Sequence, residues 1–215
     1  MTRLFHSKVF TPLHTGRGRG WVCRGFWGRV CVVRWVCVVF LLLLLLSCDN
    51  AENSVYQDHK CYFIFDTSLH PLPCQLTSAL GNPGHFLTVS STMSNGIRHI
   101  QTTRNYDQAK EDIPLTTQRE AQTSCILGAN NAIIVGRSSY TGLLMAYEGQ
   151  CPNCLTDFGG ISYPLTWTKN GLQVECARCH RSYDINNGVV AAGDGGRQLY
   201  TYNIALDGAV LRAWN

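Results

Sequence analysis

The chain has 215 residues, 45% hydrophobic and 15% charged, which is enough for one ordinary domain preceded by a leader. Its formal net charge of +4 is unevenly distributed: residues 1–47 hold seven Lys and Arg and no acid, whereas residues 48–215 hold eleven basic and fourteen acidic residues. The basic charge therefore belongs to the leader, and the remaining chain offers no electrostatic argument for a nucleic-acid partner.

Residues 1–47 are predicted to be a leader that exports the protein. Trp35–Leu46 is a run of twelve apolar residues behind a positive flank, too short to span a bilayer comfortably and typical of a signal-peptide core. The run ends in Leu45-Leu46-Ser47-Cys48, which resembles the lipobox of bacterial lipoproteins. The resemblance implies lipidation of Cys48, a tether over residues 48–55, and a membrane-anchored protein in the bacterial cell envelope that faces the periplasm or the exterior. The alternative is a plain signal peptide with an incidental cysteine.

Seven of the eleven cysteines follow Cys48. In an exported protein spare cysteines can pair. Cys61 and Cys74 flank a turn that contains Pro71 and Pro73, and we predict a local disulfide between them. Cys125 is predicted to be a buried small hydrophobe in a strand.

Residues 56–215 are predicted to form one all-β domain, a sandwich or barrel, because short apolar and β-branched runs recur between Gly, Pro and Asn breakers. The one helical expectation is a turn at Asp107–Asp112, ended by Pro114. The runs expected to form strands are 56–65, 85–91, 132–135, 143–147, 172–176, 188–190, 199–204 and 209–212.

Two C-x-x-C pairs are the strongest functional signal: Cys151 with Cys154, and Cys176 with Cys179. Each pair converges two thiolates, so together they predict one tetrahedral metal ion or one small iron-sulfur cluster. The pairs are separated by twenty-one residues, close to the spacing of about fifteen to twenty typical of zinc sites. Two disulfides are the third alternative in an exported protein.

The residues from Cys176 onward resemble the second cluster-binding loop of Rieske iron-sulfur proteins. With Cys176 on the family's cysteine, the pattern continues without a gap, and the resemblance covers roughly residues 131–207. It implies a Rieske-like β-sandwich or barrel with two facing metal-binding loops, a 2Fe-2S cluster, electron transfer and an unidentified redox partner protein. The matching positions are Tyr183, Asp184, Gly188, Val190, Gly193, Leu199, Tyr202 and Ile204.

The ligand positions depart from that family. Asn153 and Cys179 occupy the two histidine positions, and His180 lies one residue late, so the cluster would be an all-cysteine variant with His180 as a neighbouring donor or an exchanged ligand. The alternative function is a non-enzymatic surface binding or interaction lipoprotein, in which Zn²⁺ or disulfides replace the cluster. No catalytic residues are visible in the sequence, and the protein is at most an electron-transfer component. His59, His70, His85 and His99 lack ligand spacing and are expected to be surface or turn residues.

Overall fold

The computed structural model describes residues 55–168 and 170–215. By internal contacts the chain divides into Met1–Ala51 and Glu52–Asn215, and the description below concerns the second unit. The predicted leader, the predicted lipidation site Cys48 and most of the predicted tether lie outside the described residues. Within the described residues, no helix is long and apolar enough to cross a membrane.

Thirteen strands and three short helices make up the described chain, all strand pairs are antiparallel, and the all-β prediction is confirmed. In chain order the elements are β1 (Cys61–Asp66), α2 (Gln75–Gly81), β2 (Phe86–Ser94), β3 (Ile97–Arg104), β4 (Lys110–Leu115), α3 (Gln118–Gln122), β5 (Ile126–Leu127), β6 (Ala132–Arg137), β7 (Leu144–Glu148), α4 (Pro152–Phe158), β8 (Leu165–Trp167), β9 (Gln173–Cys176), β10 (Ser182–Asp184), β11 (Val190–Ala192), β12 (Asn203–Asp207) and β13 (Val210–Trp214).

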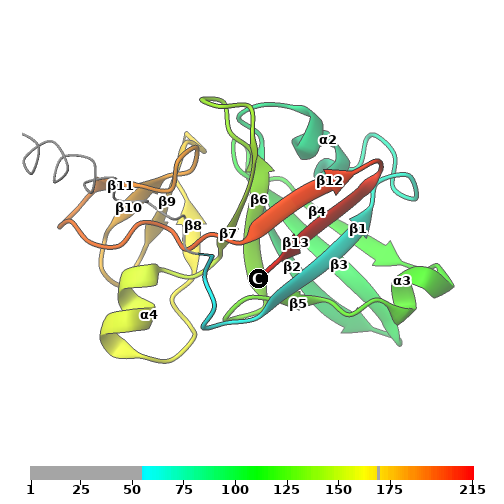
Figure 1. Ribbon diagram of the computed structural model, residues 1–215, viewed down its shortest axis with the longest axis horizontal. Coiled ribbons are helices and arrows are strands. Elements are labelled where there is room, and N and C mark those ends of the chain that lie inside the picture. The colour runs from blue at the N-terminus through cyan, green and yellow to red at the C-terminus, as the bar shows by residue number, and fades with distance from the viewer. Residues whose placement is uncertain (1–54, 169) are drawn as a thin grey trace, which may run out of the picture. The chain divides into compact units, whose positions relative to one another are not determined.

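The strands form three sheets (Figure 1). A five-stranded sheet of order β4-β3-β2-β6-β7 and a four-stranded sheet of order β12-β13-β1-β5 enclose one core. A smaller sheet of order β11-β10-β9-β8 lies with α4 at the other end of the described unit. We call this end, residues 150–199 apart from 169, the site lobe.

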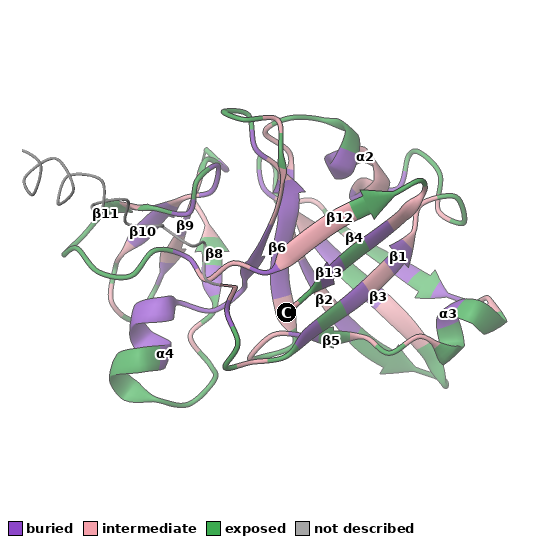
Figure 2. Cartoon of the chain, in the orientation of Figure 1, coloured by how far each residue is buried: buried purple, intermediate pink, exposed green. Residues whose placement is uncertain are grey.

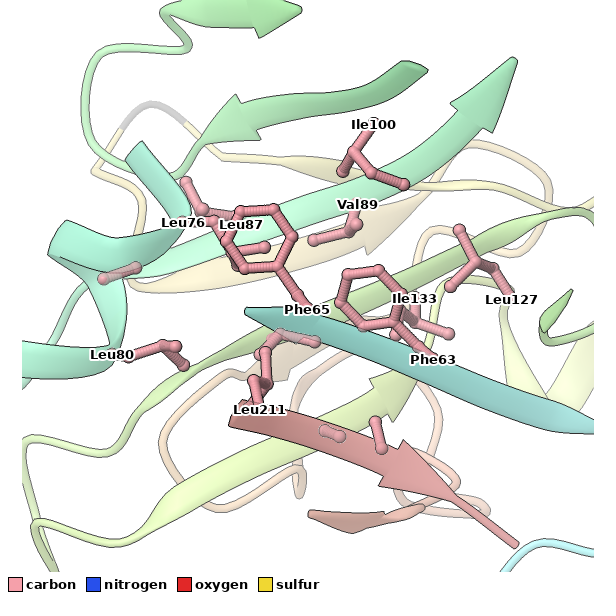
Figure 3. Close-up of a cluster of buried hydrophobic side chains, with 14 of the residues drawn as sticks. Phe63, Phe65, Leu76, Leu80, Leu87, Val89, Ile100, Leu127, Ile133 and Leu211 are labelled. Atoms are coloured by element: carbon pink, nitrogen blue, oxygen red, sulfur yellow. The ribbon is translucent and has the colours of Figure 1, made fainter. Parts of the chain in front are cut away.

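The sandwich core lies between the two larger sheets. Successive side chains of β1 point to opposite faces of its sheet, so Phe63 and Phe65 both face the sandwich core. Both are almost fully buried. They meet Leu87 and Val89 of β2, Ile133 of β6 and the buried face of α2, as Figure 3 shows. Figure 2 shows the resulting stripes of buried residues on β1, β6 and β13. This core is built from apolar side chains that the strand period aligns on one face.

The five-stranded sheet also forms the wall of a second core. On β6, Ile133 and Val135 face the sandwich core whereas Ile134 faces the site lobe. On β7, Ala146 faces the sandwich core and Tyr147 the site lobe. Since successive side chains of a strand point to opposite faces, one sheet fixes the position of both cores.

The helical turn expected at Asp107–Asp112 is wrong. This segment turns at Asp107 and then continues as β4, which pairs only with β3 at the edge of its sheet. Pro114 lies within β4, opposite His99, and an edge strand tolerates a residue without an N–H because one side of the strand needs no ladder bond.

The predicted disulfide between Cys61 and Cys74 is not formed, and both residues are free thiols. Cys61 begins β1, where its sulfur donates to the Ala213 carbonyl at 3.7 Å. Cys74 is the N-cap of α2, beyond the far end of the same strand. A strand of this length carries the chain about 17 Å before the proline turn, so proximity in sequence does not bring the two sulfurs together.

Candidate metal centre

The first pair of cysteines is positioned by the start of α4. Strand β7 ends at Glu148, and Cys151 then forms the N-cap of the helix, with Pro152 in its first turn. The Leu155 N–H donates to the Cys151 carbonyl at 3.0 Å, which closes the first helical turn. Cys151 and Cys154 are therefore three residues apart on one face of the helix.

The second pair is positioned by the hairpin between β9 and β10. Cys176 ends β9, its N–H donates to the Arg181 carbonyl at 3.0 Å, and its carbonyl accepts from the His180 N–H at 2.8 Å. His180 has a φ of +56°, a left-handed conformation that closes the tight turn. This turn directs Cys176 and Cys179 toward α4.

The structure brings the four sulfur atoms together, all within 4.8 Å of one another. Two close sulfur–sulfur contacts join residues of different loops: Cys151 to Cys179 at 3.6 Å, and Cys154 to Cys176 at 3.7 Å. All four are free thiols, so the disulfide alternative is not what this structure shows. Cys151, Cys154 and Cys176 are buried, whereas Cys179 is partly exposed.

Burial and hydrogen bonds shift the pKa values of the thiols in opposite directions. Burial raises the pKa of the Cys151 thiol to about 11 and also raises the pKa of Cys154. Burial opposes ionisation of Cys179 too, but hydrogen bonds with the Arg181 backbone and guanidinium outweigh it and lower the pKa of that thiol to about 7. Several adjacent thiolates in a buried pocket require a cation among them, because thiolates repel one another and cannot be solvated there.

Around the buried cysteines Cys151, Cys154 and Cys176 the core residues are mostly apolar, and two polar side chains lie beside Cys151. The site core contains Phe86, Leu165 and Val174 next to the cysteines. Within it the Tyr183 hydroxyl lies 3.2 Å from the Cys151 sulfur, and the Asn153 amide donates to that hydroxyl at 2.9 Å. A set of four soft sulfur donors in a dry pocket suits zinc or iron-sulfur centres and not hard cations such as Mg²⁺.

Packing within the site core depends on Gly188. Its φ is +76°, and an added Cβ would lie 3.0 Å from the Tyr147 ring. A side chain at this position would be both strained and crowded, so Gly188 allows the turn between β10 and β11 to pack against Tyr147 of β7.

His180 lies outside the sulfur cluster. Its side chain is 79% exposed, and its nearest charged partner is Glu175, with Nδ1 3.9 Å from a carboxylate oxygen. This arrangement does not support a ligand role. Two of the other histidines pair with carboxylates far from the site, His70 with Glu120 and His99 with Asp112, each at 2.6 Å.

The polar residues Asn153 and Tyr183 were visible in the sequence only as members of a pattern. Asn153 was identified as the residue at the family's first histidine position, and Tyr183 as the aromatic residue before Asp184. Their contact with each other and with Cys151 joins residues thirty or more positions apart in the chain. No local spacing signals such a contact.

Fold and site together define an all-β protein with a buried four-cysteine cluster. No protein-family model and no curated protein matches the chain. Among solved structures, the plasma-membrane Rieske protein PetC3 of the cyanobacterium Synechocystis PCC 6803 is similar at 20% identity, with a TM-score of 0.30, over 38% of this chain and 75% of that one.

A second solved structure is the ferredoxin of carbazole 1,9a-dioxygenase from Nocardioides aromaticivorans IC177. It is similar at 15% identity, with a TM-score of 0.28, over 40% of this chain and 77% of that one. Both overlaps are confined to part of this chain.

Proposed function

We propose that this domain is a metal-thiolate protein in which Cys151, Cys154, Cys176 and Cys179 hold one metal centre, and that a single tetrahedral zinc ion is its occupant. The observation that carries the proposal is that all four sulfurs lie within 4.8 Å of one another. A zinc–sulfur distance of about 2.3 Å places the sulfurs of a tetrahedral site about 3.8 Å apart. The observed cross-loop distances of 3.6 and 3.7 Å are close to that value.

Such a zinc site is structural. Four protein ligands leave no open position for substrate or water, and the ion links the start of α4 to the β9–β10 turn. The domain is then a non-enzymatic binding or interaction module whose loops are fixed by metal. Because binding requires deprotonated thiols brought together by folding, metal affinity and folding of the site lobe are coupled.

A Rieske-like electron carrier with an all-cysteine 2Fe-2S cluster is the second candidate. The sequence register from Cys176 to Ile204 favours it, as does the partial exposure of Cys179, which gives one edge of the site access to a redox partner protein. A two-iron cluster distributes its four ligands over two metals, so the sulfur pairs would have to separate from the spacing of a single tetrahedron.

Metal analysis and the visible spectrum of anaerobically purified protein test the proposal. A colourless protein with one zinc per chain supports the zinc site. Two irons and two sulfides per chain, with visible absorption bands, support the electron carrier in its place. A folded protein that retains neither metal under reducing conditions, with its melting temperature unchanged by added Zn²⁺, overturns both.

The electron-carrier candidate also makes its own prediction. Four thiolates add negative charge and, once bound, do not exchange protons as histidine ligands do. The potential should therefore lie near the roughly −400 mV of plant-type ferredoxins, below the about −150 to +300 mV of Rieske centres. It should also stay nearly flat between about pH 6 and 9. A positive potential that falls with rising pH in protein-film voltammetry would assign a histidine ligand.

We also propose that the domain is anchored to the bacterial envelope through lipid on Cys48. The apolar run that ends in Leu45-Leu46-Ser47-Cys48 supports this location. Cys48→Ala should release the protein from the membrane fraction or leave it unprocessed, as membrane fractionation and acyl labelling would reveal, with Cys37→Ala inside the apolar run as the control. Correct cleavage and acyl labelling of the Cys48→Ala protein would refute the anchor.

A further inference from the structure

An exposed loop contacts the side chain of Asn153, which lies between the two cysteines of the first pair in the sequence. We call Asp194–Gln198 the covering loop; all five of its residues are exposed. The site lobe fixes it from two sides. The Arg181 guanidinium donates through Nε to the Asp194 carbonyl at 2.7 Å and the Gly195 carbonyl at 3.1 Å, and Asn153 holds its other end.

The Asn153 side chain forms two hydrogen bonds with the backbone of this loop, as a paired β-strand residue does. Its side-chain oxygen accepts from the Arg197 N–H at 3.0 Å, and its amide donates to the Arg197 carbonyl at 3.0 Å. The residue is 2% exposed. At Gly196, with a φ of +148°, an added Cβ would collide with the Asn153 side-chain oxygen. The loop is therefore fitted closely onto this one side chain.

The same amide leaves the Tyr183 hydroxyl proton available for a hydrogen bond to a cysteine sulfur. One amide hydrogen of Asn153 goes to Arg197 and the other to the Tyr183 hydroxyl, at 2.9 Å. A hydroxyl has a single proton. Because the Tyr183 oxygen accepts from Asn153, its own proton remains free to point at the Cys151 sulfur, 3.2 Å away.

We propose that Asn153 is a positioning residue that holds the Tyr183 hydroxyl as a donor to the Cys151 sulfur and thereby couples the covering loop to the metal centre. This inference rests on the proposed four-thiolate site. A hydrogen bond donated to a bound thiolate withdraws electron density from sulfur and orients it, and loss of such a supporting contact typically weakens metal binding about 10- to 100-fold. Asn153 acts on the metal only through Tyr183 and Cys151.

Co²⁺ is a suitable probe because it binds tetrahedral thiolate sites and its sulfur-to-metal charge-transfer band reports on the electron density of sulfur. Asn153→Leu preserves side-chain size and removes both polar atoms. We expect it to weaken Co²⁺ binding about tenfold and to move the band to longer wavelength. Tyr183→Phe should do the same.

Asn186→Leu is the matched control. Asn186 is also a buried asparagine of the site lobe, 3% exposed, and its side chain accepts from the Ser139 N–H at 2.7 Å. It fixes a loop without contacting a cysteine in the described contacts. We expect this variant to lower stability without moving the Co²⁺ band.

A double-mutant cycle separates positioning from general structural loss. In the Tyr183→Phe background, Asn153→Leu should cause no further band shift and no further tenfold loss of affinity. Equal effects of Asn153→Leu in both backgrounds, or an unmoved band in the single variant, would overturn this inference alone. A wild-type protein that binds no Co²⁺ through its four thiolates would instead overturn the proposed function, and this inference with it.

Discussion

The sandwich core and the site core lie on opposite faces of the same five-stranded sheet, but they differ in residue type and in strand length. The sandwich core is filled by large apolar side chains on long strands, such as Phe63, Phe65 and Leu87. The site core is enclosed by strands of three or four residues, and three of its buried residues are the cysteines Cys151, Cys154 and Cys176.

This difference indicates what stabilises each region. Burial of a large apolar side chain contributes about 1.5–3 kcal/mol, so the sandwich core can account for its own stability. A cysteine buries less apolar surface, and its larger contribution comes from binding a metal. We therefore expect the sandwich to be stable without metal and the site lobe to depend on metal, and the following changes test that contrast.

Removing a ligand should have the largest effect. Cys176→Ser should lose most of the bound metal and lower the unfolding free energy of the metal-loaded protein by about 5 kcal/mol or more, because metal binding and folding of the lobe are coupled. Elemental analysis and thermal unfolding with and without chelator measure both effects.

Cys74→Ser is the control for that variant, since Cys74 is also a buried free thiol but belongs to the sandwich core. It should retain full metal content. If Cys176→Ser keeps its metal and its wild-type melting temperature, the four sulfurs do not form one centre.

The converse change acts on the sandwich. Phe63 is 1% exposed and central to its core, so Phe63→Ala should cost about 3–5 kcal/mol. Metal affinity should change little. Urea unfolding monitored by amide hydrogen exchange should assign the loss to β1, β2 and β6, and a loss of metal in parallel would show that the two cores are not independent.

The sequence predicts the sandwich better where apolar alternation is strong. Strands β1, β2, β6, β7 and β13 were expected from such runs. Strand β3 was missed because its sequence, Ile97–Arg104, is mostly polar, and its face is defined only by pairing with β2. A local signal was present: Asn95 and Gly96, both with positive φ, form the two-residue turn of that hairpin.

For the site, too, the sequence predicted local features but not the contacts that depend on tertiary packing. The C-x-x-C spacing predicted which cysteines converge, because each pair lies within one turn of chain. It did not predict the close sulfur contacts between loops, from Cys151 to Cys179 and from Cys154 to Cys176. Nor did it predict α4, which begins at Pro152. Cross-loop distances depend on how α4 packs against the hairpin, and that information is tertiary.

A smaller effect is expected at Glu148, whose carboxyl group contacts Tyr202 of the sandwich core. This residue is fully buried, and burial raises the pKa of its carboxyl group, although hydrogen bonds from the Tyr202 hydroxyl and the Ala129 N–H partly offset the rise. A raised pKa in the folded state means that the fold favours the neutral acid. The resulting stability is complete below the unfolded pKa of about 4.3 and is lost as pH rises through the folded value.

Unfolding free energy should therefore fall as pH rises above about 4.3, by at most about 1.4 kcal/mol per pH unit from this group. Glu148→Gln retains an acceptor for Tyr202 and removes the titration, so it should flatten that part of the profile. Denaturant unfolding of both proteins from pH 4 to 8 measures the difference. An identical pH dependence in the variant would show that folding does not change the pKa of Glu148.

The smallest effect is expected at His180, although this residue directly follows the ligand Cys179 in the chain. Its imidazole is 79% exposed and is not part of the sulfur cluster, so metal affinity should change less than about twofold in His180→Asn. Asparagine is the suitable replacement because it tolerates the φ of +56° that this position requires, whereas alanine would add backbone strain.

Cys179→Ser, one residue earlier, should lose most of the metal. Competition with a chromophoric chelator compares the two directly. If His180→Asn loses its metal and Cys179→Ser keeps it, then His180 is the fourth ligand, and the second loop binds metal one residue later than the sulfur geometry indicates.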